Sequence, residues 1–192
     1  LPGSRKGEVA RLAPVIGDVL AQIKAVHPTA RIALPTVRGV AQLVRDLSAD
    51  WPIQPQIIQD PSLKRAAFAL ADVAIAASGT VSLEPAANAC PMAIAYDMHP
   101  TTLWLMRRAA LIDSVTLVNL VSDSRVVPEF IGKACRADRI APALLNLLAN
   151  PQAQDAAMHL TMERLGKGGE PPGLRAAKSV LGALPPLQLP KI

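Results

Sequence analysis

The segment that most constrains the fold is an apolar run at 73–77 followed at once by Ser78, Gly79 and Thr80. This order predicts a buried parallel strand, a tight turn and the start of a helix. Backbone N–H groups at such a helix start bind anions, and Gly79 lacks the Cβ that would keep a phosphate away. Ser78 and Thr80 add hydroxyl donors, and Glu84 lies about one helical turn further on. We expect its carboxylate to accept hydrogen bonds from ribose, which predicts a nucleotide-sugar diphosphate site. An ordinary turn with a solvated Glu84 is the alternative.

A second turn of this kind stands at the beginning of the sequence. Gly3, Ser4 and Arg5 precede apolar residues with helical spacing. We expect Ser4 to cap this helix and Arg5 to bind phosphate through its forked guanidinium. Pro14 should bend the helix or begin a second segment, because it removes an interior hydrogen bond. The alternative for Arg5 is a charge that serves only solubility.

The composition indicates which kinds of ligand and partner the chain can bind. The chain has 192 residues, 51% of them hydrophobic, and a net charge of +5, which favours a folded domain with anionic ligands. The charges are scattered and aromatic residues are few, so nucleic acid is not an expected partner. Cys90 and Cys135 have neither metal-ligand nor disulfide-framework spacing, which fits a reducing compartment. No apolar run reaches membrane-spanning length.

Strand and helix patterns alternate along the chain. We expect a Rossmann-like α/β domain over 1–165, with a parallel sheet and helices on both faces, and a linker, terminal helix and tail over 166–192. Ligands bind such sheets at the carboxyl ends of the strands, where both turns lie. The predicted strands are 31–34, 56–59, 73–77, 92–96 and 115–118. The predicted helices include 37–47, one from Pro61, 101–111, 124–131, 137–148, 152–165 and 174–184.

Several short motifs, taken in order, resemble a known family. They are 1–6, 77–80 with 83–84, 90–92, Tyr96 with Pro100, 104–105, 107–108, 117–120 around Asn119, and 125–129. Together they are similar to the carboxyl-terminal half of lipid-A-disaccharide synthase. This resemblance implies one half of a two-Rossmann-domain (GT-B type) glycosyltransferase.

The resemblance also implies an activity. Such enzymes transfer diacylglucosamine from UDP-diacylglucosamine to diacylglucosamine phosphate (lipid X), with inversion and release of UDP. They need no metal, and we expect no other cofactor. They work in the cytoplasm, peripherally on the anionic inner membrane of Gram-negative bacteria. A homodimer is a further expectation. The acceptor site and the catalytic base are expected in an amino-terminal domain outside this chain, so the isolated chain should be inactive.

We expect nine residues to bind the donor: the six turn residues and Glu84 described above, and two more, Asn119 and Arg125, whose roles the resemblance implies. They are Gly3, Ser4, Arg5, Ser78, Gly79, Thr80, Glu84, Asn119 and Arg125. Asn119, placed at a strand end, should face the ligand, so Asn119→Ala should depress turnover and leave thermal stability nearly unchanged. Arg125, placed at a helix start, should neutralise the departing diphosphate. Asp97, Asp123 and Pro85 depart from the family pattern and place donor affinity and local helix geometry in question. A nucleotide-sugar epimerase of the same fold and a binding-only fragment remain alternatives.

Overall fold

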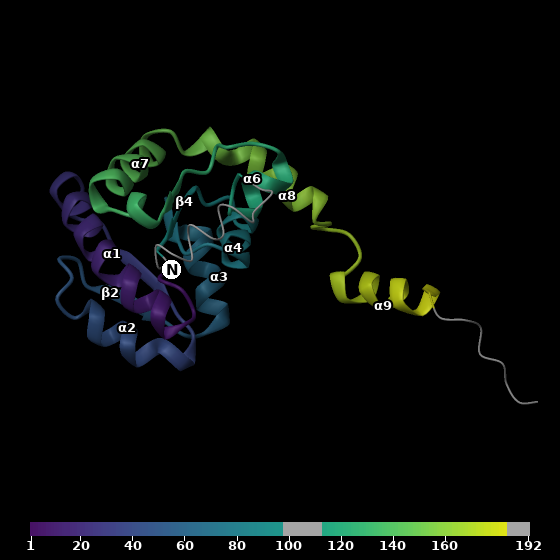
Figure 1. Ribbon diagram of the computed structural model, residues 1–192, viewed down its shortest axis with the longest axis horizontal. Coiled ribbons are helices and arrows are strands. Elements are labelled where there is room, and N and C mark those ends of the chain that lie inside the picture. The colour runs from purple at the N-terminus through teal and green to yellow at the C-terminus, as the bar shows by residue number, and fades with distance from the viewer. Residues whose placement is uncertain (98–112, 184–192) are drawn as a thin grey trace, which may run out of the picture.

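The computed structural model describes residues 1–97 and 113–183 (Figure 1). The strands are β1 (Ile32–Pro35), β2 (Pro55–Ile58), β3 (Ala74–Ala76), β4 (Met92–Tyr96) and β5 (Glu129–Ile131). The longer helices are α1 (Lys6–Val26), α2 (Ala41–Ser48), α3 (Pro61–Leu70), α7 (Ala137–Ala149), α8 (Asp155–Arg164) and α9 (Pro172–Ala183). The short helices are α4 (Leu83–Ala87) and α6 (Leu117–Ser122), with 3-10 turns at Arg38–Val40, Thr80–Ser82, Gly132–Ala134 and Pro151–Gln154.

The strands pair in parallel throughout. β1 pairs with β2, and a separate three-stranded sheet has the order β3-β4-β5. Leu1 extends the second sheet, because its nitrogen donates to Ile75 O at 2.8 Å and its carbonyl accepts from Ala77 N at 3.0 Å. The carboxyl end of β3 therefore lies close to the Gly3 turn.

Helices cover both faces of the three-stranded sheet, as expected of an α/β domain. In β4, Ala93 and Ala95 enter one core while Met92 and Ile94 enter another, as expected from the two-residue alternation of a strand. Helices α1, α2 and α7 pack on the first core, and α4, α6 and α8 cover the second. The predicted parallel α/β architecture with helices on both faces is confirmed.

Four of the five predicted strands are present, and one region differs. The run 115–118 is not a strand: its last two residues begin helix α6, whose Val118 carbonyl accepts from Thr161 Oγ1 on α8 at 3.2 Å. The predicted helix 124–131 is also wrong, because Glu129–Ile131 forms strand β5 beside β4. Pro128 explains this, since the residue before a proline is disfavoured in the α conformation.

Helix α1 also differs in detail from its prediction. It runs unbroken from Lys6 to Val26 with Pro14 inside it, so no second segment begins there. The predicted helix after Gly79 is a 3-10 turn followed by the five-residue α4. Pro85 lies in this helix, where it is buried. The anion-binding contribution of this helix start therefore depends on local N–H groups more than on a helix dipole.

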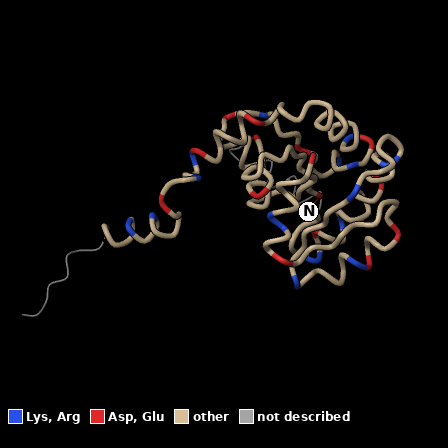
Figure 2. Tube along the Cα trace, turned by 180° about the vertical axis from the view of Figure 1, so that it is seen from behind, with Lys and Arg blue, Asp and Glu red and all other residues tan. Residues whose placement is uncertain are grey.

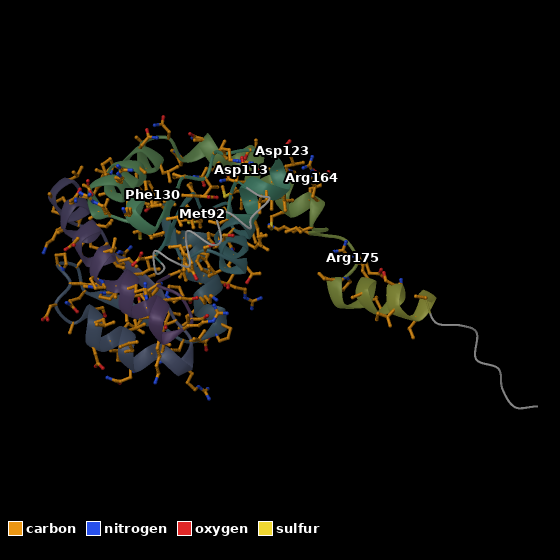
Figure 3. The ribbon with its side chains drawn as sticks, in the orientation of Figure 1. Met92, Asp113, Asp123, Phe130, Arg164 and Arg175 are labelled. Atoms are coloured by element: carbon orange, nitrogen blue, oxygen red, sulfur yellow. The ribbon has the colours of Figure 1, made fainter. Side chains whose placement is uncertain are left out.

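Beyond α8 the chain leaves the body, and α9 projects away from it (Figure 1). Arg175 connects the two parts by donating to Leu165 O at 2.9 Å (Figure 3). Lys and Arg residues are interspersed with Asp and Glu residues over the body (Figure 2). Within the described residues, no helix is both long and apolar enough to cross a membrane. The predicted helix 101–111, with Pro100 and the motifs at 104–105 and 107–108, lies outside the described residues.

Candidate functional site

The two glycine turns line one pocket. This pocket has a volume of about 340 Å³ and opens at the carboxyl ends of β1 and β3, within the size range of small-molecule sites. Seven of the nine predicted site residues line it: Gly3, Ser4, Arg5, Ser78, Gly79, Thr80 and Glu84. The structure therefore brings together two motifs that lie more than seventy residues apart in the sequence.

The first turn is organised by Glu8. Its Oε2 accepts from the backbone nitrogens of Ser4 at 3.2 Å and Arg5 at 3.3 Å, and its Oε1 accepts from Arg5 Nη1 at 2.8 Å. Gly3 has φ +108°, and a Cβ there would lie 2.7 Å from Glu8 Oε2. Glycine is thus required both by backbone conformation and by the close approach of Glu8. Arg5, not Ser4, is the N-cap residue, which corrects the predicted cap.

Two side-chain hydrogen bonds to backbone carbonyls stabilise the second turn, which comprises Ser78, Gly79 and Thr80. Ser78 Oγ donates to Val115 O at 3.3 Å, and Ser82 Oγ donates to Gly79 O at 2.9 Å. Gly79 has φ +112°, a conformation that favours glycine. Apart from Gly79 itself and its neighbours Ser78 and Thr80, no heavy atom of the described residues lies within 4 Å of the position that a Cβ on Gly79 would take. The turn thus presents open space above its backbone.

The pocket contains a lysine that the sequence reasoning missed. Lys64, in the first turn of α3, places its Nζ 2.7 Å from Oε1 and 2.6 Å from Oε2 of Glu84. The signal was its position shortly after the carboxyl end of β2, because helices that follow parallel strands begin at the ligand-binding edge. Thr36, directly after β1, was missed as well; its buried Oγ1 has no hydrogen-bond partner among the described residues.

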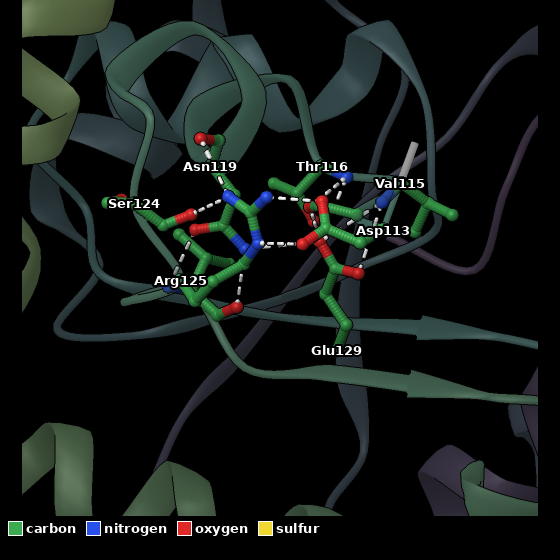
Figure 4. Close-up of polar contacts among 9 residues, drawn as sticks. Asp113, Val115, Thr116, Asn119, Ser124, Arg125 and Glu129 are labelled. Atoms are coloured by element: carbon green, nitrogen blue, oxygen red, sulfur yellow. Dashed lines mark hydrogen bonds and ion pairs between the residues drawn. The ribbon is translucent and has the colours of Figure 1, made fainter. Parts of the chain in front are cut away.

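Asn119 has a different environment from the predicted one. It lies in helix α6 with 1% of its surface exposed, not at a strand end facing a ligand. Its Oδ1 accepts from Val127 N at 3.0 Å, and its Nδ2 donates to Val127 O at 2.9 Å and Glu129 Oε1 at 3.1 Å (Figure 4). The side chain fixes the segment that leads into β5. Its direct contact with the donor stays a prediction.

Glu129 is the centre of this network. Besides Asn119, its carboxylate accepts from Ser114 Oγ and from the backbone nitrogens of Val115 at 3.1 Å and Thr116 at 3.0 Å. Burial opposes the charge, but the hydrogen bonds outweigh it and lower the pKa of the Glu129 carboxyl. This network around Glu129 is connected to the pocket through one hydrogen bond, because Val115 O accepts from Oγ of the pocket residue Ser78.

Arg125 lies beside this cluster in the loop after α6, not at a helix start. Its guanidinium pairs with Asp113, with Nε 3.2 Å from Oδ2 (Figure 4). Hydrogen bonding to Arg125 lowers the pKa of the exposed Asp113 carboxyl. Asp123 ends α6 with φ 54°, a left-handed conformation that aspartate tolerates. Asn119 and Arg125 do not line the 340 Å³ pocket.

A model of the family described as lipid-A-disaccharide synthetase matches residues 1–178. The chain belongs to this family. The lipid-A-disaccharide synthase of Ruegeria pomeroyi is 54% identical to it over 193 residues, covering 96% of this chain and 48% of the relative. Those of Rhodospirillum centenum and Rhodopseudomonas palustris are 38% and 40% identical over 187 residues, again with 96% of this chain and 47% and 48% of each relative. The chain spans about half the length of these curated relatives.

Membership in this family confirms the resemblance drawn from the motifs. It also agrees with the fold, since parallel strands covered on both faces are expected of one Rossmann-like half of a GT-B glycosyltransferase. The match includes both glycine turns, Asn119 and Glu129. The pocket between the turns is therefore the candidate ligand site of a lipid-A-disaccharide synthetase family member.

Proposed function

We propose that this chain is the donor-binding half of an inverting glycosyltransferase of lipid A biosynthesis. The donor is UDP-diacylglucosamine, the acceptor is diacylglucosamine phosphate, and UDP is released. The observation that carries the proposal is the shared pocket: two glycine turns with an arginine, hydroxyls and a carboxylate open into one cavity of about 340 Å³. The names of the relatives support the same reaction class and favour it over a same-fold epimerase.

The roles of the pocket residues follow from their chemistry. Arg5 and the hydroxyls of Ser78 and Thr80 would bind the diphosphate, and Gly79 would let it approach the backbone. As UDP departs, its negative charge grows, and a cation placed there lowers the barrier. Glu84 would accept hydrogen bonds from the ribose hydroxyls. Arg125 would act on the leaving diphosphate from the loop after α6, and Asn119 would contribute to donor binding from within α6.

The acceptor must be deprotonated by a general base, which we place in the half of the protein outside this chain. That half would also carry the acceptor site. We further propose peripheral contact with the anionic inner membrane on its cytoplasmic side, in keeping with the net charge of +5. The domain would comprise 1–165, with 166–192 as linker, terminal helix and tail.

Calorimetric titration tests the nucleotide site. UDP should bind the purified chain, and Glu84→Ala should weaken UDP binding by about 1.5–3 kcal/mol for each charged hydrogen bond lost. Binding of pyrophosphate should not weaken, because it has no ribose. Glu163→Ala removes the same charge from an exposed position on α8 and should change neither. Equal UDP affinity in Glu84→Ala and the wild type would disprove the ribose assignment.

An activity assay tests where the catalytic base lies. The chain alone should form no detectable disaccharide from UDP-diacylglucosamine and diacylglucosamine phosphate. Addition of the separately purified amino-terminal half should restore product formation. Turnover by the chain alone, with contaminating full-length enzyme excluded, would place the base within these residues. UDP binding without turnover in the mixture would support the binding-only alternative.

A further inference from the structure

The ion pair between Lys64 and Glu84 crosses from α3 to α4 over a sequence separation of twenty residues. Both carboxylate oxygens of Glu84 lie within 2.7 Å of Lys64 Nζ. The lysine is held from a second side as well, because its Nζ lies 6.0 Å from the ring centroid of the buried Phe68. Only 28% of the Lys64 side chain is exposed. The ammonium therefore has a fixed place in the wall of the pocket.

This placement resolves an electrostatic difficulty in the proposed site. A nucleoside diphosphate carries several negative charges, and an uncompensated Glu84 carboxylate in the same pocket would repel them. Lys64 cancels the charge of Glu84 by direct contact. A carboxylate has about four lone-pair positions, so two oxygens already bound to an ammonium can still accept hydrogen bonds from hydroxyls. Glu84 can thus bind ribose hydroxyls beside a diphosphate while Lys64 stays in place.

We propose that Lys64 is a positioning residue of the nucleotide site: it orients the Glu84 carboxylate toward the ribose and neutralises it, so that the diphosphate is tolerated next to it. This inference rests on the function proposed above. The competing explanation is a brace between α3 and α4 that has no part in binding. Partly exposed ion pairs contribute little to folding stability, so removing this one should leave the chain folded.

The test is calorimetric titration of the 192-residue chain with UDP and with uridine, which lacks the phosphates. Lys64→Met should weaken UDP binding by roughly 10-fold, the size expected for one charge-assisted interaction. Uridine binding should weaken less, because uridine loses only the orientation of Glu84, whereas UDP also meets the repulsion between Glu84 and the diphosphate. Arg65→Met is the matched control: it removes a cation from the next position of α3, outside the pocket lining, and should change UDP affinity less than 2-fold.

A double variant separates charge neutralisation from direct phosphate contact. Glu84→Gln removes the charge that Lys64 neutralises and keeps an amide that bonds ribose. Lys64→Met combined with Glu84→Gln should therefore bind UDP more tightly than Lys64→Met alone. Circular dichroism melts of each variant confirm that the measured affinities belong to folded protein.

The opposite results would overturn the inference. If Lys64→Met bound UDP as tightly as the wild type, Lys64 would serve only as a structural brace between α3 and α4. Equal losses for UDP and uridine would mean that Lys64 shapes the site without acting on charge, and a double variant weaker than Lys64→Met would mean that it does not act through Glu84. Failure of the wild-type chain to bind UDP would instead refute the proposed nucleotide site, and this inference with it.

Discussion

Replacing Asn119 with alanine tests whether this residue is primarily structural. Its side chain bonds both the nitrogen and the oxygen of Val127, at 3.0 and 2.9 Å, and Val127 is 1% exposed. Alanine would leave two buried backbone groups without partners, and would also remove a hydrogen bond to Glu129. Each unpaired backbone group costs about 1–3 kcal/mol.

With the lost packing included, we expect Asn119→Ala to lower the free energy of unfolding by about 3–5 kcal/mol. This is a large part of the roughly 5–15 kcal/mol that stabilises a typical domain. Urea denaturation followed by circular dichroism measures it directly. Asn146→Ala is the control, because Asn146 is exposed on α7 and its loss should change stability by less than about 0.5 kcal/mol.

A loss below about 1 kcal/mol in Asn119→Ala would refute this reasoning, because two unpaired buried groups should cost more than that. The expectation drawn from the sequence would then be correct: turnover in the reconstituted enzyme would fall while the melting temperature held. A large loss of stability would not by itself exclude a donor contact, so turnover should be measured per folded molecule at a temperature where the variant is intact.

Three further outcomes follow from the structure. The pKa of the Glu129 carboxyl is lowered in the folded chain, so its contribution to stability is complete above its ordinary pKa and is lost as the pH falls through the lowered value. The urea midpoint of the wild type should therefore fall on acidification. In Glu129→Gln, which has no titrating carboxyl at this position, the fall should be less steep. Burial raises the pKa of Cys90 to about 12 and that of Cys135 to about 11, so neither thiol should react with iodoacetamide at mildly alkaline pH until guanidinium chloride unfolds the chain. Ala89 is exposed with φ 54°, so Ala89→Gly should raise the free energy of unfolding by about 0.5–1 kcal/mol in urea denaturation; an unchanged or lower value would contradict this account.

The sequence predicted most strands because each is a short apolar run bounded by proline, glycine or polar residues. It failed at 115–131, where local preference and tertiary packing disagree. The run at 115–118 is rich in β-branched residues, yet Leu117 and Val118 begin α6, which packs against α8. The position of this segment depends on hydrogen bonds to Glu129 from residues 13 to 15 positions earlier. Such contacts cannot be seen in a local pattern.

The candidate site also contains residues that a local pattern predicts and residues whose roles depend on distant contacts. Gly3 and Gly79 were found because a glycine followed by hydroxyl or cationic residues at a helix start has a local physical meaning. Lys64 was not found because its role depends on Glu84, twenty residues away on another helix. Likewise, Asn119 was assigned to the ligand because the sequence does not show that Val127 and Glu129 use its amide.

The pairing of both pocket cations determines how a nucleotide would enter. Among the described residues, Arg5 pairs with Glu8 and Lys64 pairs with Glu84, so a diphosphate must exchange partners instead of meeting an unpaired cation. The Arg5 side chain is 80% exposed, which makes its ion pair weak and its rotation inexpensive. Lys64 is 28% exposed and touches both oxygens of Glu84. Arg5 is therefore the cation expected to move to the diphosphate, while Lys64 remains with Glu84. Glu8 lines the same pocket. It would keep the hydrogen bonds from the N–H groups of Ser4 and Arg5, which partly compensate its charge and hold the shape of the turn when the guanidinium turns toward the diphosphate.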